Sequence, residues 1–417
     1  MCSREMKDSG IEWIGYIPND WYLEKLKNLY SFEKGKNAAL YTQEYIGTHK
    51  GEYPVYSGQT ENDGIMGNID TYDYEENECL FTTTVGAKVM TPRVIKGKFS
   101  LSQNCLIMKS NNNSSIKFIY YMLNPLFNYE KALIPAYMQP SLRVSDLCRY
   151  QFYVPNIEEQ QQIVNYLDQK VSQINDIISK QKSLIEKYKA YKQSLITETV
   201  TKGLNKNVPM KDSGIEWIGE IPSHWDLVKL KFIFTIKKEI ANKLGYDILS
   251  VTQSGVKVKD ISNNEGQISA DYSKYQLVDI DDFVMNHMDL LTGFVDCSKF
   301  KGVTSPDYRV FRFINNNKNS KRYYNYILQS CYKNKIFYGL GQGVSNLGRW
   351  RLQTDKFMNF ILPVCSLEEQ KEIADFLDKK CKAIDCTISK KQQLIKKLEL
   401  YKKSLIYECV TGKREVN

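Results

Sequence analysis

The strongest constraint on this chain is a thirteen-residue phrase that occurs twice. "MKDSGIEWIGYIP" covers residues 6–18 and "MKDSGIEWIGEIP" covers residues 210–222, and the two copies differ only where Glu220 replaces Tyr16. Chance does not produce a match of this length. The chain must therefore be built as two related halves, each opened by the phrase.

A second repeat closes each half. Residues 158–201 align without gaps on residues 368–411, with 22 of 44 positions identical. Both stretches lack Pro and Gly and are rich in Leu, Ile, Lys, Glu and Gln, a composition that favours helix. Apolar residues recur near heptad spacing. The predicted seam consists of Leu167, Ile174, Leu184, Tyr188, Tyr191 and Leu195 in the first stretch and Leu377, Ile384, Leu394, Leu398, Tyr401 and Leu405 in the second.

A helix of about 40 residues would be ~60 Å long, and its apolar stripe needs a partner. The nearest partner is its own duplicate, so the repeat predicts an intramolecular, antiparallel coiled coil. Gln181 and Lys391 share one equivalent seam position. These polar residues either fix the register or are an ordinary irregularity of the heptads.

The order is phrase, domain and helix, repeated once. We expect four segments, at residues 1–157, 158–202, 203–366 and 367–412, with Gly203 and Pro209 as stop signals after the first helix. Both globular parts mix short β-branched and aromatic runs with Gly and Asn turns and one helical stretch, which predicts an α+β fold. If the chain ends were joined, the last residues would run into the phrase. The phrase therefore marks where the chain leaves a helix and enters a domain, which is a structural role.

Composition excludes several classes of protein. No apolar run approaches the ~20 residues of a membrane helix, and the first residues carry no hydrophobic signal segment, so we expect a cytoplasmic protein without membrane contact. Ten cysteines occur without a C-x-x-C pair, and none of the three histidines stands at zinc-ligand spacing from a cysteine. This usage is typical of free thiols in a reducing cytosol.

Acidic residues are missing from two comparable windows. Residues 79–129 contain six Lys or Arg and residues 308–354 contain nine, with no Asp or Glu in either. Unpaired cations repel one another, so such windows favour a polyanionic partner. A solvated basic surface could produce this pattern in one half, but it is a weaker explanation for both.

Asn, Gln and aromatic residues accompany these charges. Arg and Lys neutralise phosphates, while Arg, Asn and Gln also form bidentate contacts with guanine and adenine edges. The windows therefore predict nucleic-acid binding. The candidate contacts are Lys88, Arg93, Lys96, Lys98, Gln103, Asn104, Arg309, Arg312, Lys333, Lys335, Gln342, Asn346, Arg349, Trp350 and Arg351.

Two basic domains joined by rigid helices would act as a calliper on duplex DNA. Each domain would read one short sequence, and the helices would set the separation. Because the two domains have diverged almost completely, we expect a bipartite, asymmetric target.

Motifs for catalysis are absent. The chain has no G-x-x-x-x-G-K-[ST] loop, and the glycine-rich residues 339–348 do not form a G-x-G-x-x-G motif after a strand. "NPLF" at residues 124–127 lacks the second proline of the adenine methyltransferase signature, and "PDYR" at 306–309 has no following acid before Asp355. We expect no catalytic residue, no bound cofactor and no metal site in this chain.

The phrase, "EYPVYSGQ", "SPDYRVFRF" and "LPVCSLEEQKEIADFLD" together resemble the specificity subunit of type I restriction-modification systems. The resemblance covers essentially the whole chain. It implies two target recognition domains and two conserved helices in a bacterial, DNA-associated complex. It also implies two modification subunits that methylate adenine with S-adenosylmethionine, and two restriction subunits that use ATP and Mg.

Two other functions remain open at this stage. One is the recognition module of a stand-alone methyltransferase complex, and the other is a non-catalytic coiled-coil adaptor between proteins. The adaptor explains the long helices but not the acid-free windows.

Overall fold

The chain folds into two compact units. The computed structural model describes residues 4–86, 88–111, 114–260, 272–343 and 350–416. Unit 1 comprises Met1–Gln181 and Gln392–Asn417, and unit 2 comprises Lys182–Lys391. Each unit thus contains part of α5 (Ile157–Lys202) and part of α9 (Leu367–Val410). The four segments expected from the sequence instead divide the chain at the ends of these two helices.

Unit 1 is built on a mixed sheet. Its sheet strands are β4 (Tyr30–Lys34), β5 (Lys50–Tyr56), β6 (Ile65–Ile69), β7 (Tyr74–Thr83), β8 (Arg93–Leu101) and β9 (Cys105–Ser110), and its helices are α1 (Leu26–Leu29), α2 (Gln43–Thr48), η1 (Asn62–Gly64), α3 (Ile116–Leu133) and α4 (Val144–Arg149). The six strands follow the order β4-β9-β7-β8-β5-β6. Only the β5–β8 pair is parallel.

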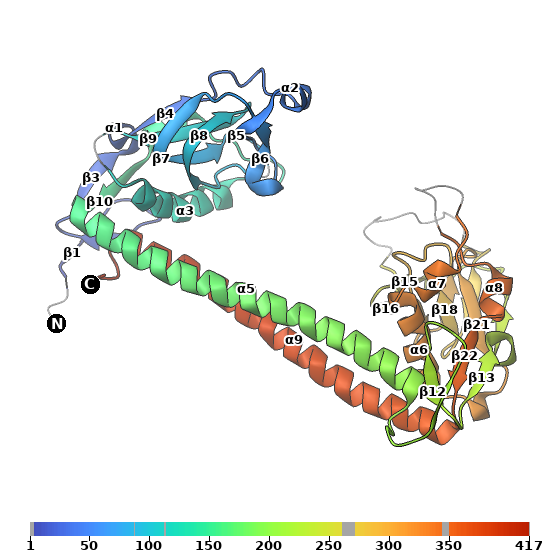
Figure 1. Cartoon of the computed structure of the whole chain (residues 1–417). Helices are drawn as coiled ribbons and strands as arrows, with labels where there is room; N and C mark the ends of the chain where they lie inside the picture. Colours follow the sequence, from blue (N-terminus) through green and yellow to red (C-terminus); the bar gives the residue numbers. More distant parts are fainter. Residues whose placement is uncertain (1–3, 87, 112–113, 261–271, 344–349, 417) are drawn as a thin grey trace. The chain divides into compact units, whose positions relative to one another are not determined.

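Helix α3 packs on β7 and β8 and buries the centre of this sheet (Figure 1). Its first turn is capped by Ser115, whose hydroxyl accepts a hydrogen bond from Phe118 N at 3.2 Å. The helix continues through Pro125 to Leu133. The proline therefore lies within the helix, whose buried face holds it in place.

Unit 2 has a smaller and more divided set of sheets. Its strands are β14 (Phe234–Lys237), β15 (Leu249–Thr252), β16 (Gly255–Val258), β17 (Gln276–Val278), β18 (Phe283–Met285), β19 (Val295–Cys297), β20 (Gly302–Thr304) and β21 (Arg309–Phe313), and its helices are η2 (Leu230–Phe232), η3 (Asn316–Lys318), α6 (Lys321–Lys333), α7 (Ile336–Gly339) and α8 (Thr354–Met358). The main sheet has the order β14-β21-β18-β19, and β15-β16 and β17-β20 form separate pairs. An aromatic cluster around the buried Phe234 forms its core, with Phe283, Phe311 and Phe313 at 4.8–5.3 Å between ring centroids.

Each unit contains two short two-stranded pairs, and each pair has an equivalent in the other unit. The repeated phrase forms the hairpins β1 (Met6–Asp8)–β2 (Tyr16–Pro18) and β11 (Met210–Asp212)–β12 (Glu220–Pro222), with identical registers. The strands that enter and leave each domain also pair, as β3 (Tyr22–Lys25)–β10 (Gln151–Val154) and β13 (Asp226–Lys229)–β22 (Ile361–Val364). The sequence repeat is thus a repeat of structure, and the α+β class is confirmed.

The long helices are α5 (Ile157–Lys202) and α9 (Leu367–Val410). They run antiparallel within each unit (Figure 1). In unit 1, Lys402 donates to Asn175 at 2.9 Å. In unit 2, Lys192 pairs with Asp385 at 2.7 Å, and Lys391 lies over the ring of Tyr188.

The predicted seam is right at some positions and wrong at others. Leu167, Ile174, Leu377, Ile384 and Leu405 are buried. Four predicted seam residues are instead more than a third exposed: Leu184, Tyr191, Leu394 and Tyr401. The residues buried one position away are Ile185 and Ile395. At these four positions the predicted residues lie beside the buried contact between the helices and not within it.

A joint of repeated residues ties each domain to its helices. The indole of buried Trp21 donates to Glu159 in unit 1, and that of Trp225 donates to Glu369 in unit 2 at 3.0 Å. The glutamine of each E-E-Q motif accepts a hydrogen bond from the N-cap residue of the main domain helix. Ser115 N, at the start of α3, donates to Gln160, and Ser320 N, at the start of α6, donates to Gln370 at 2.8 Å.

Glycine ends each long helix against the same joint. Gly203 and Gly412 follow α5 and α9 with φ of +73° and +68°, a conformation that favours glycine. A Cβ on Gly412 would lie 2.4 Å from Pro18, and one on Gly203 would lie 3.2 Å from Trp225. The end of α9 therefore packs on the first phrase just as the end of α5 packs near the second. This contact matches the expectation that the phrase lies where a helix leads into a domain.

Candidate nucleic-acid interface

Three loops of unit 1 meet at Thr84. Its backbone N–H donates to Asn104 O, and its carbonyl accepts from Leu142 N, both at 2.8 Å. Val85 and Ser141 also form a β-bridge. These bonds join residues 84–92 between β7 and β8, residues 102–104 between β8 and β9, and residues 134–143 between α3 and α4. We call the described residues of these segments the unit 1 loop surface.

Unit 2 brings the corresponding loops together at His287. Its carbonyl accepts from Leu352 N at 2.9 Å, and Leu290 N donates to Trp350 O. Gln342 and Arg351 exchange two backbone hydrogen bonds at 3.0 and 3.1 Å. The unit 2 loop surface comprises the described residues of 286–294 and 340–353. In both domains, a loop between two strands is thus bonded to the loop that precedes a short helix, by Leu142 N to Thr84 O in unit 1 and by Leu352 N to His287 O in unit 2.

Half of the unit 1 candidates lie on this surface. Lys88, Gln103 and Asn104 are exposed in its first two loops. The other three candidates lie on β8. Arg93 packs over the ring of Phe81, and Lys98 lies over Tyr72 at 4.7 Å and beside Glu75, whereas Lys96 is exposed.

The unit 2 candidates are more scattered. Gln342 and Arg351 are exposed on the loop surface, and the ring of Trp350 lies 5.0 Å from that of Tyr338 with an interplanar angle of 49°. Lys335 is exposed at the start of α7, and Arg312 pairs with Glu239 and Asp282. Asn346, Arg349 and residues 344–348 of the glycine-rich stretch lie outside the described residues.

Arg309 belongs to the interior, not to the exposed surface that we expected. It is 3% exposed, its guanidinium donates to Leu352 O at 3.0 Å, and it lies over the ring of Phe357 at 4.7 Å. Burial and the nearby Arg351 lower its pKa to about 10. Arg309 therefore supports the loop surface from the interior, through its hydrogen bond to the backbone of Leu352.

His287 is buried beside the same cation. It is 7% exposed, and burial together with Arg309 and Arg351 lowers its pKa to about 3. Neutral imidazole is thus the stable form at neutral pH.

The sequence reasoning missed the α3–α4 loop. This loop contains Tyr137, which is 88% exposed, and Met138, which is 54% exposed. It lies beyond the acid-free window, so a search guided by charge passed over it. The loop stands at the same place before the first E-E-Q motif as the glycine-rich loop does before the second. This correspondence is the sequence signal that points to it.

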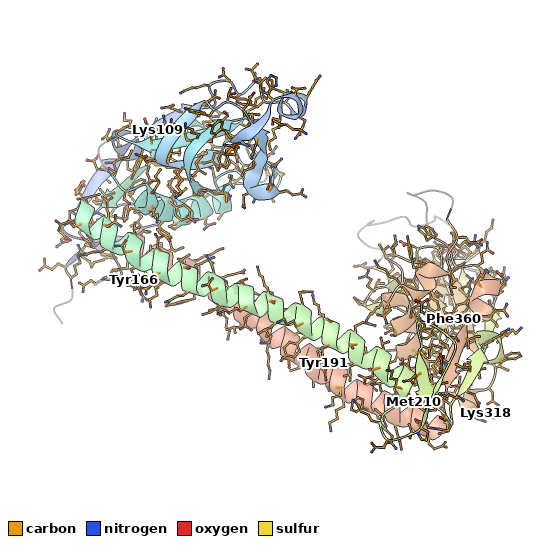
Figure 2. The ribbon with its side chains drawn as sticks, viewed as in Figure 1. Lys109, Tyr166, Tyr191, Met210, Lys318 and Phe360 are labelled. Carbon is orange, nitrogen blue, oxygen red and sulfur yellow. The ribbon has the colours of Figure 1, made fainter. Side chains whose placement is uncertain are left out.

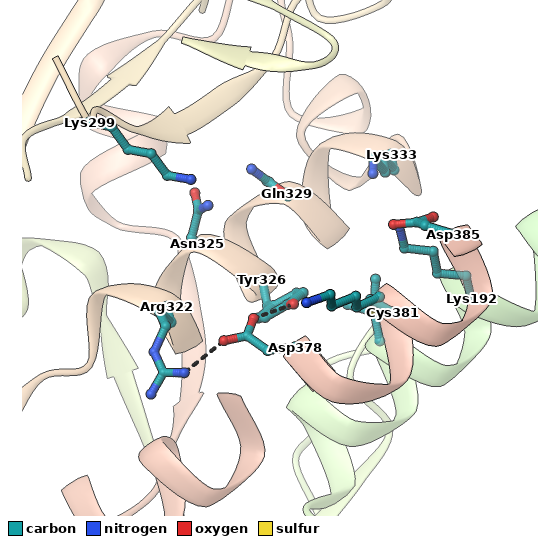
Figure 3. Close-up of a pocket in the computed structure, with 12 residues that line it drawn as sticks. Lys192, Lys299, Arg322, Asn325, Tyr326, Gln329, Lys333, Asp378, Cys381 and Asp385 are labelled. Carbon is teal, nitrogen blue, oxygen red and sulfur yellow. Dashed lines mark hydrogen bonds and ion pairs between the residues drawn. The ribbon is translucent and has the colours of Figure 1, made fainter. Parts of the chain in front are cut away.

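Lys333 lies in a hollow of about 560 Å³ in unit 2, between α6 and the long helices (Figure 3). Arg322 and Tyr326 of α6 cross this hollow to Asp378 of α9, at 2.7 Å each. In unit 1, Lys117 and Tyr121 of α3 bind Asp168 of α5 at 2.6 and 2.7 Å. The pair of contacts is the same in both units, and it fixes the main domain helix to a long helix.

The described residues contain no group of three or more His, Cys, Asp or Glu side chains that could hold a metal ion. Across the same residues, no helix combines the length and the apolar character that crossing a membrane requires.

The model of the type I restriction modification DNA specificity domain matches this chain twice, over residues 18–187 and 222–399. Among curated proteins, the MjaVIII specificity subunit of Methanocaldococcus jannaschii, a type I restriction enzyme component, is 26% identical over 96% of this chain and 94% of its own length. A type I specificity subunit of Mycoplasma pneumoniae is 31% identical over 40% of this chain and 44% of its own length.

Solved structures share the fold. A chain of a type I restriction-modification system, determined in a study of complex assembly, has a TM-score of 0.69 at 10% identity and covers 95% of this chain and 99% of its own. The HsdS subunit of Thermoanaerobacter tengcongensis has a TM-score of 0.52 at 10% identity, over 98% of this chain and 100% of its own.

Two loop-bearing α+β domains on a repeated helical frame define a two-domain recognition subunit. The chain belongs to the type I restriction-modification DNA specificity family, because the family model matches both halves over most of the sequence. The resemblance inferred from the phrase and the E-E-Q motif is confirmed.

Proposed function

We propose that this chain reads a bipartite, asymmetric sequence in double-stranded DNA and directs adenine methylation and DNA cleavage by partner subunits. The observation that carries the proposal is the presence of one loop surface on each domain, held by an equivalent backbone hydrogen bond (Leu142 N to Thr84 O and Leu352 N to His287 O) but made of different residues. Two different surfaces on one repeated frame would read two different half-sites. The long helices, which contribute to both units, would set the spacer between them.

The partners that we propose are two modification subunits and two restriction subunits. Leu184 and Tyr191 on α5 of unit 2 are 37% and 56% exposed. Figure 2 labels Tyr191 on this helix. The repeat equivalents of these two residues on α9 of unit 1, Leu394 and Tyr401, are 42% and 50% exposed. Each unit thus offers an equivalent apolar pair on a long helix, which suits one modification subunit per unit.

Cofactors belong to these partners in our proposal. S-adenosylmethionine would be bound by the modification subunits, and ATP with Mg by the restriction subunits, while this chain itself would be non-catalytic. Because the complex would act on DNA inside a bacterial cell, we place the chain in the cytoplasm.

The experiment is to express the chain with its modification subunit in a host that lacks adenine methylation, and to map methylated adenines by sequencing. The expected result is methylation at one asymmetric sequence with a fixed spacer, and none with either subunit alone. Methylation by the chain alone would contradict the non-catalytic role. A complex that forms without binding any duplex would favour the adaptor, and methylation without cleavage when restriction subunits are added would favour a stand-alone methyltransferase.

Single substitutions on the loop surfaces test the contact model. Lys88→Ala in unit 1 and Arg351→Ala in unit 2 should each weaken DNA binding by the assembled methyltransferase. If the lost contact is to a phosphate, affinity falls on all sequences and the slope of log K against log salt drops by about one. If Arg351 reads a guanine edge, the loss is confined to the cognate site, at roughly 1–3 kcal/mol. Arg309→Ala serves as a contrast, because it should lower stability before it affects binding.

A further inference from the structure

The tip of the α3–α4 loop presents apolar side chains to solvent on a surface that is otherwise polar and basic. Tyr137 is the most exposed large apolar residue in the described part of the chain, at 88%, and the adjacent Met138 is 54% exposed. Leu133 at the end of α3 is 62% exposed, and Val85 in the facing loop is 39% exposed. Single exposed apolar residues are ordinary, but four on one joined set of loops form a patch.

The backbone beneath this tip is fixed. Met138 N donates to Pro135 O at 2.9 Å, which closes a turn around Tyr137. On the far side of the tip, Ser141 bridges to Val85, and Leu142 is buried and bonded to Thr84. Prolines at 135 and 140 restrict the chain on both sides. An anchored loop loses little backbone entropy when its side chains enter a binding site.

The surroundings of the tip favour DNA over an apolar protein partner. The 84–92 loop, which is bonded to it, carries Lys88, and the 102–104 loop, which is bonded to Thr84, carries Gln103 and Asn104. Both loops lie within the window that contains no acid. The nearest acids along the chain are Glu130 and Asp146, and Asp146 is bonded to Arg149 and to Arg143 N. An apolar tip within a basic and amide-bearing rim is the arrangement with which proteins insert a wedge between base steps.

We propose that Tyr137 and Met138 form a wedge that enters the duplex at the half-site read by unit 1 and unstacks one base step. Tyr137 would stack on the exposed base, Met138 would fill the opened step, and Lys88 with Gln103 would hold the flanking strand. The cost of opening depends on the step, so the wedge would add specificity at a position without hydrogen-bond readout. This inference rests on the proposed function and assigns a particular contact to it.

The test uses the complete methyltransferase with a duplex that carries the mapped site. Base unstacking is read by 2-aminopurine in place of each adenine other than the methylated one, and by permanganate oxidation of thymines. The wild-type complex should give one unstacked step in the half-site assigned to unit 1. Tyr137→Ala should abolish that signal and weaken cognate binding by about 5- to 150-fold, the range expected for loss of one stacked base. Its salt slope should stay unchanged, because no phosphate contact is lost.

Two variants serve as controls. Tyr137→Phe keeps the ring and should keep the unstacking signal. Tyr16→Ala removes another exposed tyrosine, at the position where the second phrase has Glu220, and should change nothing.

Three outcomes would overturn the wedge. The first is a Tyr137→Ala complex that behaves as wild type, and the second is an equal loss of affinity on cognate and scrambled duplexes with a smaller salt slope. The third is loss of the modification subunit from the complex, which would make the tip a protein contact. If the wild-type complex itself fails to prefer any sequence, the proposed function fails and the wedge fails with it, a result distinct from these three.

Discussion

Units 1 and 2 agree where the domain meets the helices and differ where the loops face outward. Trp21 and Trp225 make the same bond to the glutamate of the E-E-Q motif, and Asp168 and Asp378 receive the same two kinds of donor from α3 and α6. In the interiors, one unit has a six-stranded sheet and the other a four-stranded sheet with separate pairs. The two units therefore share the side chains of the joint but differ in the strands and loops of their domains.

The largest expected effect comes from exchanging one domain. Replacing residues 19–157 with the equivalent region of a family member should change one half of the methylated sequence completely and leave the other half as it was. Mapping methylated adenines in cells that carry only the hybrid chain gives the answer. The matched exchange of residues 223–366 should alter the other half. A change in both halves from one exchange would mean that the two domains read jointly.

Loss of a joint tryptophan should be the largest single-residue effect. Trp21 is 1% exposed and Trp225 is 0% exposed, so truncation to Ala should cost roughly 3–5 kcal/mol in either unit. Hydrogen exchange measured by mass spectrometry should show faster exchange in unit 1 for Trp21→Ala and in unit 2 for Trp225→Ala. Trp217→Ala is a milder control, because this side chain is only partly buried against Phe360. Unequal costs for the two joint residues would break the equivalence of the units.

Acid should affect unit 2 before unit 1. Because the pKa of His287 falls from an ordinary 6.5 to about 3 on folding, the unfolded chain binds a proton first as the pH falls. The stabilisation is complete above pH 6.5 and is lost towards pH 3, by up to ~1.4 kcal/mol per pH unit. Unfolding of unit 2 followed between pH 6.5 and 4.5 should show this slope, and His287→Phe should remove it. An unchanged slope in that variant would assign the effect to other groups.

The smallest expected effect concerns the two equivalent aspartates. Asp168→Asn and Asp378→Asn each remove one partly exposed ion pair but keep a hydrogen-bond acceptor, so each should cost about 0.2–1 kcal/mol. Denaturant unfolding with local exchange rates can resolve such a change. Asp375→Asn, which removes a second partner of Arg322, is the control in unit 2. A cost several times larger in one unit would show that the aspartate contact contributes unequally to the stability of the two units.

The sequence predicted the frame well because the frame is repeated. The helices α5 and α9 begin and end within two residues of the predicted ranges, since Pro-free and Gly-free stretches with glycine stops have strong local signals. The seam was harder, because apolar residues such as Leu184 and Tyr191 lie beside the buried contact between the helices. Spacing alone does not distinguish a residue that packs on the partner helix from one beside it.

The interface could be predicted only in part, because charge in a sequence window does not reveal direction. Lys88 and Arg351 are exposed on the loop surfaces, but Arg309 points into the interior between Leu352 and Phe357. Burial of one arginine in such a window depends on contacts made some 45 residues away, as with Thr354. Tyr137 carries no charge and lies outside the acid-free windows, so the charge pattern does not point to it.

The composition of unit 1 has a consequence for synthesis of the chain. Unit 2 is one continuous segment, so all of its residues have been synthesised before residue 392 is added. Unit 1 needs residues 392–417 to complete its helix pair and to cover Trp21 with the turn at Gly412. The domain that is synthesised first is thus the last to be completed. Until then, part of the apolar joint around Trp21 is not covered by the turn at Gly412. Nascent chains stalled shortly before residue 392 would therefore present this open joint to chaperones and proteases.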